Sequence, residues 1–200
     1  MSGVVRSVGR VLLPARCPVC RLPGPAPCGR CVAQLRPAPL WAPTPQLAEA
    51  VALFAHDGVG RELVLRLKYA NHRDGLGRLG AALGAVCATV GPIDAVTWVP
   101  TTSDHRVERG FDQAELLARS VARSLGRRGV RLLDRVGGAQ SGRDRAGRSE
   151  VRFRPRRPVS GTVVVVDDVR TTGASLQAAA AALRAAGAAR VVGATLSARP

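Results

Sequence analysis

A run of five strand-favouring residues, 162–166, most constrains the fold of this 200-residue chain. Four consecutive valines follow Thr162, and no polar residue interrupts them. An apolar run without alternation is typical of a central strand in a parallel sheet, because helices cover both of its faces. The run therefore predicts an α/β domain, with a parallel sheet flanked by helices.

The rest of the chain alternates between short apolar runs and longer stretches with a helical period of 3.6 residues. This alternation predicts further strands at 51–55, 96–99, 130–133 and 189–196. It predicts helices at 62–69, 76–89, 113–125 and 175–186. Residues 137–157 are dense in Gly and Arg and lack an apolar period, which predicts a long loop. We expect one main domain over residues 49–200.

Four of the five cysteines lie within a fifteen-residue window, as two C-x-x-C pairs, Cys17 with Cys20 and Cys28 with Cys31. Four thiolates can close a tetrahedral shell around one Zn²⁺ ion and leave no position for a substrate. The alternative, disulfide pairing, is disfavoured in a reducing cytosol. We therefore expect a structural zinc finger within residues 1–36. Val and Leu residues at helical spacing predict a short amphipathic helix before it, over residues 1–13. A Pro-rich linker, 37–48, would join this module to the main domain.

The sequence contains no run of 18 consecutive apolar residues, so we expect no membrane span. Arginines interrupt the apolar residues near the start of the chain, which argues against a signal-peptide core. We therefore expect a cytoplasmic protein.

The chain is strongly basic, with 30 Lys and Arg against 14 Asp and Glu and a net charge of +16. Residues 119–157 alone contain thirteen Arg and three acidic residues, a net charge of +10. Such an excess favours polyanionic partners, which include nucleic acid, anionic lipid and small molecules with several phosphates. Because no membrane segment is expected, nucleic acid and phosphorylated small molecules remain as the two classes of partner.

The segment after the valine run carries the clearest candidate site. Two carboxylates, Asp167 and Asp168, follow the predicted strand, and a short loop then leads into a helix. Ligands of open α/β sheets bind beyond the carboxyl ends of strands, and a helix N-terminus can bind phosphate. The acid pair suits the vicinal hydroxyls of a ribose or a Mg²⁺ shell. We therefore expect a ribose 5-phosphate site that combines the acids with Thr171, Thr172, Gly173, Ala174 and Ser175.

This segment resembles the phosphoribosyl pyrophosphate signature of type I phosphoribosyltransferases, in which a hydrophobic strand precedes two acids, T-T-G and a Ser or Thr. Nearly the whole chain is similar to the ComF family of competence proteins, because further motifs occur in that family's order. They are the four-cysteine finger, Leu67-Lys68-Tyr69, Val99-Pro100, the R-G-F-D-Q-A-E-L-L-A segment at 109–118, and Gln140 with its Arg-rich loop.

The resemblance implies a type I phosphoribosyltransferase-like fold that binds phosphoribosyl pyrophosphate, or a related sugar phosphate, with Mg²⁺. It implies transfer of the phosphoribosyl group to an acceptor. Asp167 and Asp168 would hold the ribose hydroxyls, residues 171–175 the 5-phosphate, and Arg143 and Arg145 the leaving pyrophosphate as their loop closes. Further contacts on the pyrophosphate side would come from Thr102, Ser103, Arg106 and Arg109.

The same resemblance leaves a second interpretation open, in which the fold is reused without catalysis. The chain would then be a single-stranded-DNA-binding or adaptor protein of natural competence. Its basic segment, 119–157, would hold the DNA backbone, and a competence helicase would be its protein partner.

Overall fold

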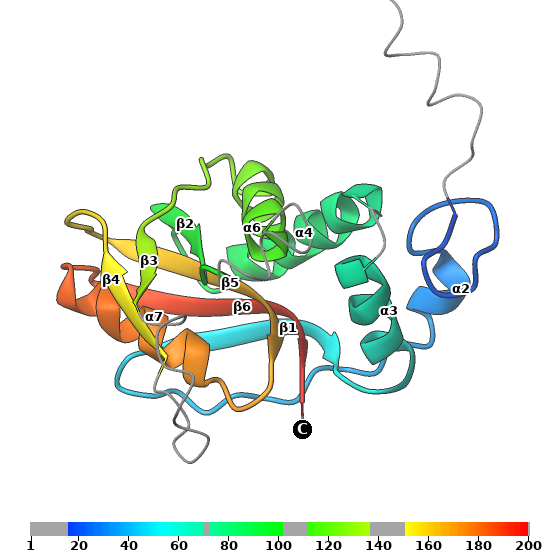
Figure 1. Ribbon diagram of the computed structural model, residues 1–200, viewed down its shortest axis with the longest axis horizontal. Helices are drawn as coiled ribbons and strands as arrows, with labels where there is room; N and C mark the ends of the chain where they lie inside the picture. The colour runs from blue at the N-terminus through cyan, green and yellow to red at the C-terminus, as the bar shows by residue number, and fades with distance from the viewer. Residues whose placement is uncertain (1–15, 70–72, 102–111, 137–150, 200) are drawn as a thin grey trace, which may run out of the picture.

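The structure is a computed structural model that describes residues 16–69, 73–101, 112–136 and 151–199. The short helix expected over residues 1–13 lies outside the part of the chain that the structure describes. Its centre is a fully parallel sheet of β1 (Glu49–Ala55), β2 (Ala95–Trp98), β5 (Thr162–Arg170) and β6 (Arg190–Ala198). The strand order is β1-β6-β5-β2, so the valine-rich β5 lies inside the sheet (Figure 1). The predicted α/β class, a parallel sheet flanked by helices, is confirmed.

Helices cover both faces of the sheet, as the uninterrupted valine run requires. Figure 1 shows α4 (Arg73–Ala88) and α6 (Gln113–Ser124) on one side and α7 (Ala174–Ala185) on the other. Val164 and Val166 pack into the core beneath α4 and α6, whereas Val163 and Val165 pack against α7. Because alternate strand residues face opposite sides, one run of valines contributes to both cores.

The helix α3 (Gly58–Tyr69) follows β1 and packs on β1 and β6. Its neighbour α4 lies against α6 at very short range. A Cβ atom at Gly80 would lie 2.4 Å from Ser120 Cβ, and one at Gly84 would lie 2.8 Å from Ser124 Cβ. The Gly-rich sequence of α4 therefore serves close helix packing.

Two expectations for the middle of the chain are wrong. Residues 130–133 do not form a strand of the main sheet, because only Gly129 before them makes an isolated parallel bridge to Val96 of β2. The expected loop 137–157 is described only from residue 151 onward, and this part contains a short strand. β3 (Leu133–Val136) and β4 (Arg152–Pro155) form a separate antiparallel ribbon that packs on α7. The reason is that β4 has a two-residue period, with exposed arginines alternating with half-buried Phe153 and Pro155. The density of arginine concealed that period.

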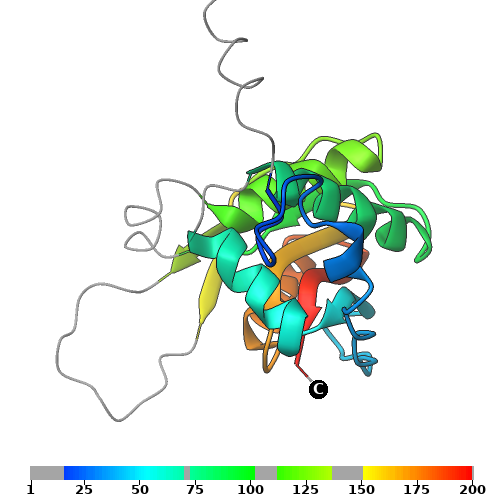
Figure 2. The ribbon, with the colours of Figure 1, turned by 90° about the vertical axis from the view of Figure 1, so that its right-hand side faces the viewer.

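The N-terminal cysteine module packs on the helices rather than standing apart from them. Figure 2 shows the module, which contains α2 (Gly29–Val32), beside α3 and α4. Ala26 is buried, and its carbonyl oxygen lies 3.5 Å from the Cβ position of Gly75 in α4. The backbone N–H of Ala55, at the end of β1, donates to the carbonyl of Arg36 at 2.9 Å.

Residues 37–48, expected as a linker, run along the main domain. Leu47 is completely buried in the core on the α7 side, and Trp41 packs against that core. Within the residues that the structure describes, we find no helix that combines the length and the apolar character needed to cross a bilayer.

Candidate functional site

A pocket of about 230 Å³ lies at the carboxyl ends of β2 and β5. The N-terminus of α6 reaches the pocket from one face of the sheet, and the N-terminus of α7 reaches it from the other. Lys68 of α3 and Arg135 of β3 add one basic side chain each to the pocket. Its walls are strongly polar, as a site for a charged ligand requires. The described residues that line it are Lys68, Val99, Pro100, Thr101, Asp112, Gln113, Ala114, Arg135, Asp167, Asp168 and Ser175.

Both predicted acids line this pocket, although β5 continues beyond them to Arg170. Lys68 Nζ of α3 lies 3.0 Å from Asp168 Oδ2, and both side chains are largely buried. Burial, with the adjacent charge of Asp168, raises the pKa of Asp167 to about 8. The Asp168 backbone N–H donates to Asp167 Oδ1 at 2.8 Å. The two carboxyls are therefore unequal: Asp168 has a cationic partner, and Asp167 favours its protonated form.

The predicted phosphate-binding segment begins the helix α7 beside this pocket. Ser175 lines the pocket itself, whereas Thr171 and Thr172 are exposed in the preceding loop. Thr172 Oγ1 accepts a hydrogen bond from the Ala174 N–H at 3.3 Å. Gly173 is the N-cap of α7 and has a φ of +78°, a left-handed conformation that favours glycine.

The loop before α7 is fixed from outside by the segment 37–48. The Trp41 ring lies so close to Gly173 that a Cβ atom there would be 2.5 Å from it. The guanidinium of Arg170, at the end of β5, lies 4.4 Å from the centre of the same ring and is itself buried. Arg170 Nη2 also donates to the carbonyl of Pro39 at 3.3 Å. Sequence reasoning missed this contact; its one signal was a lone tryptophan inside a Pro-rich stretch.

Sequence reasoning also missed the α6 wall of the pocket. Asp112 caps α6, because its Oδ1 accepts from the backbone N–H groups of Ala114 and Glu115 at 3.1 and 3.3 Å. Asp112 Oδ2 accepts from the Thr101 N–H at 3.3 Å, which ties the end of β2 to the helix. An Asp three residues before a Glu is the signal of such a helix start. The other predicted contacts lie outside the described residues: Thr102, Ser103, Arg106, Arg109, Arg143 and Arg145.

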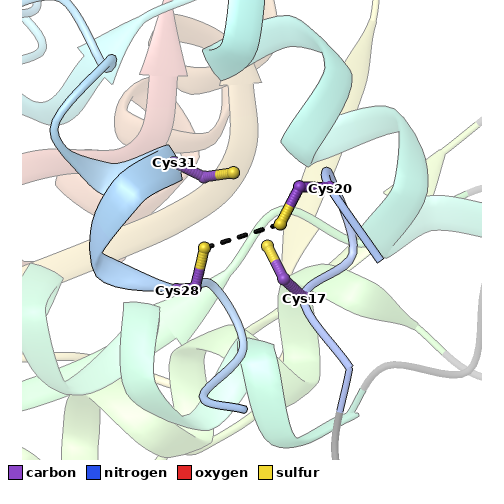
Figure 3. Close-up of side chains that lie close together, drawn as sticks. All are labelled: Cys17, Cys20, Cys28 and Cys31. Carbon is purple, nitrogen blue, oxygen red and sulfur yellow. Dashed lines mark hydrogen bonds between the residues drawn. The ribbon is translucent and has the colours of Figure 1, made fainter. Parts of the chain in front are cut away.

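The four cysteines form a second centre, well away in sequence from the pocket. Figure 3 shows Cys17, Cys20, Cys28 and Cys31 converging, and their sulfur atoms all lie within 4.8 Å of one another. The sulfur atoms of Cys20 and Cys28 are 3.6 Å apart. Four sulfurs at about 2.3 Å from one Zn²⁺ ion would be separated by about 3.8 Å. The cluster could therefore hold a zinc ion, and none of its cysteines forms a disulfide.

The electrostatics of the cluster suit a bound cation. Burial acts to raise the pKa of the Cys17 thiol, but hydrogen bonds from the backbone of Cys28, Cys20 and Val19 outweigh it and lower the pKa to about 6. Burial raises the pKa of Cys31 to about 12, helped by the other cysteine side chains. One thiolate is thus stabilised by the fold alone. A zinc ion would supply the positive charge that the buried Cys31 thiolate needs.

The chain therefore has two centres with different chemistry: a polar pocket at the edge of the sheet and a four-sulfur cluster in the N-terminal module. Their donor atoms differ accordingly. The pocket offers oxygen ligands, hydroxyls and cationic side chains, whereas the cluster offers thiolates alone. No protein-family model matches the chain, and no curated protein matches it either.

Proposed function

We propose that this chain binds phosphoribosyl pyrophosphate with Mg²⁺ and transfers the phosphoribosyl group to an acceptor, as a ComF-like member of the type I phosphoribosyltransferases. One observation carries the proposal: a single pocket combines the acid pair of β5 with the first turn of α7. A ribose 5-phosphate needs both features, at the two positions where its hydroxyls and its phosphate would lie.

The residues of the pocket suit each part of that ligand. The ribose hydroxyls would donate hydrogen bonds to Asp168 and Asp167, at the end of β5. The 5-phosphate would bind the backbone N–H groups and hydroxyls between Thr171 and Ser175, where the dipole of α7 favours negative charge. Trp41 supports this proposal from outside, because its ring packs against Arg170 and Gly173, on either side of Thr171 and Thr172.

In the proposed reaction, a nucleophile attacks the anomeric carbon of the ribose, and the bond from this carbon to the pyrophosphate oxygen breaks. Pyrophosphate leaves with the bonding electrons, through a transition state in which the sugar gains oxocarbenium character. Mg²⁺ would supply positive charge to the leaving group when bound. Arg135 lines the pocket, and we assign it to the same electrostatic role together with Arg143 and Arg145.

Isothermal titration calorimetry of the zinc-loaded protein tests the proposal. We expect heat from phosphoribosyl pyrophosphate with Mg²⁺, and affinity at least about tenfold weaker in the double variant Asp167→Asn/Asp168→Asn. The matched control is Asp94→Asn, since Asp94 is an exposed acid beside the opposite end of β2. Wild-type protein that gives no heat would overturn the proposal, and so would a double variant that binds as tightly as the control.

The second candidate function is binding of single-stranded DNA by a ComF-like adaptor of DNA uptake, with a competence helicase as partner. The β3–β4 ribbon favours it, because β4 and the residues after it expose arginines at 152, 154, 156 and 157, of which Arg156 also pairs with Asp134. Affinity governed by phosphate contacts falls with salt, with a log–log slope of about −0.7 for each contact on a single strand. Absence of single-strand binding at low salt would eliminate this candidate.

A further inference from the structure

The Gln113 side chain is polar yet buried. Its exposed fraction is 4%, and within the described part of the chain neither Nε2 nor Oε1 has a hydrogen-bond partner. A buried carboxamide without partners is unfavourable, because its donors and its acceptor have lost water and gained nothing in exchange. Such a group in a native protein needs an explanation, and a ligand that completes its hydrogen bonds is one.

Gln113 is not needed for the structure of the helix that it begins. Asp112, the residue before it, already caps α6 and holds the backbone of Thr101. A carboxamide has no advantage over an apolar side chain of the same length for packing alone. Gln113 nevertheless lines the pocket that also contains the acid pair.

The position of Gln113 in the pocket indicates which part of a ligand it would meet. Gln113 reaches the pocket from α6, and Ser175 from α7, which cover opposite faces of the sheet. The acids of β5 lie between these two walls, and the charge of Asp112 contributes to the raised pKa of Asp167. In a ribose 5-phosphate, the phosphate and the anomeric carbon are at opposite ends of the sugar. With the phosphate at α7, the anomeric carbon points to α6.

We propose that Gln113 recognises the anomeric substituent of the sugar phosphate, so that it determines specificity for the diphosphate over ribose 5-phosphate itself. This inference rests on the proposed function. Gln113 Nε2 would donate to an oxygen of the diphosphate, and Oε1 would accept from a water molecule in the filled pocket. Binding would thereby give both ends of the buried carboxamide a partner, which neither end has among the described residues.

The test compares wild type with Gln113→Met, which keeps the length of the side chain and removes its hydrogen-bonding atoms. Calorimetry is carried out with two probes in the presence of Mg²⁺, phosphoribosyl pyrophosphate and ribose 5-phosphate. We expect Gln113→Met to bind phosphoribosyl pyrophosphate at least about tenfold more weakly and ribose 5-phosphate within about twofold of wild type. Thermal unfolding of the same variant should occur at the wild-type temperature or above it, because an unpaired polar group has been removed.

Each other outcome has a distinct meaning. Wild-type affinity for both probes in Gln113→Met overturns the role of Gln113 and leaves the proposed function standing. An equal loss of affinity for both probes, together with a lower unfolding temperature, would show that Gln113 acts through packing. That result would also overturn its proposed role in recognising the diphosphate. Wild-type protein that binds neither probe overturns the proposed function together with this inference. A second variant, Gln113→Glu, should discriminate against the diphosphate more strongly than Gln113→Met, since its carboxylate repels the ligand.

Discussion

At the scale of single residues, the two acids of the pocket differ in their surroundings, because Asp168 contacts Lys68 and Asp167 lies buried beside it. A strand of valines followed by two acids predicts a site at the sheet edge, and Asp167 and Asp168 do line a pocket there. The difference between them could not be predicted, because it depends on Lys68, which lies a hundred residues earlier in the chain. Gln113 was missed for a similar reason. Its meaning comes from the absence of partners in three dimensions, and no local sequence pattern reports that.

The raised pKa of Asp167 predicts how stability changes with pH. A carboxyl that ionises less readily when folded makes the folded state bind protons more tightly, so stability falls as the pH rises from about 4 to about 8. Asp167→Asn removes this dependence. We expect the free energy of unfolding of the variant to exceed that of wild type by at least about 1 kcal/mol at pH 8. Near pH 4 the two values should be similar.

Urea unfolding of the zinc-loaded proteins at several pH values between 4 and 9 measures this difference. Asp94→Asn serves again as the control and should keep the slope of the wild-type profile. Parallel profiles for wild type and Asp167→Asn would show that the carboxyl ionises normally in the folded protein.

At the scale of elements, the predictions succeed where one apolar period persists over many residues. The helices expected at 76–89 and 113–125 are α4 and α6, which differ from expectation by only a few residues at their ends. The β3–β4 ribbon could not be predicted, because each of its strands has only four residues and β4 alternates arginine with Phe153 and Pro155. The close packing of α4 on α6 could not be predicted from the sequence either, because glycine in a helix carries no periodic signal of its own.

The contact between α4 and α6 gives a prediction about packing. Gly80→Val would place a branched side chain where Ser120 Cβ is 2.4 Å from the Cβ position. We expect a loss of about 2 kcal/mol or more in the free energy of unfolding, because the two helices must separate. The control is Gly77→Ala on the exposed side of the same helix. Among the described residues, no atom beyond the chain neighbours and the adjoining helix backbone lies within 4 Å of the Gly77 Cβ position.

Gly77→Ala should stabilise the protein by about 0.5–1 kcal/mol, since alanine restricts the unfolded chain and favours the helix. Chemical denaturation of both variants beside wild type measures the two effects. A Gly80→Val protein as stable as wild type would mean that α4 and α6 lie farther apart than the structure has them.

At the scale of the whole molecule, the four-cysteine cluster could be predicted from the sequence, but its packing on the main domain could not. The spacing of the cysteines alone indicates a closed four-sulfur site. The contact of Ala26 with α4, and the hydrogen bond from Ala55 to Arg36, depend on the tertiary structure. Residues 37–48 likewise looked like a linker because of their prolines, although Leu47 is fully buried in the core. The module therefore shares its stability with the sheet and helices.

This shared stability predicts the effect of removing the metal. We expect elemental analysis to find one zinc ion per chain, and a strong chelator to lower the unfolding temperature of the entire protein by about 5 °C or more. Scanning calorimetry should record one transition before and after chelation. Two separate transitions, of which only one responds to the chelator, would contradict the coupling.

Cysteine variants supply the control for this experiment. Cys20→Ser should lose the zinc ion and reproduce the effect of the chelator. Cys87→Ala should retain zinc, because Cys87 is buried in α4 and belongs to the core rather than the cluster. Loss of zinc from Cys87→Ala, or its retention by Cys20→Ser, would show that other ligands hold the metal.

The position of Trp41 gives the molecule an optical reporter of its own. The chain has two tryptophans, and Trp98 is buried in the core at the end of β2. Trp41 instead lies on Gly173 and Arg170, beside the loop that begins α7. We therefore expect a ligand that binds this loop to change the emission of Trp41 in the folded protein. Binding at the pocket can be followed by fluorescence without attaching any label.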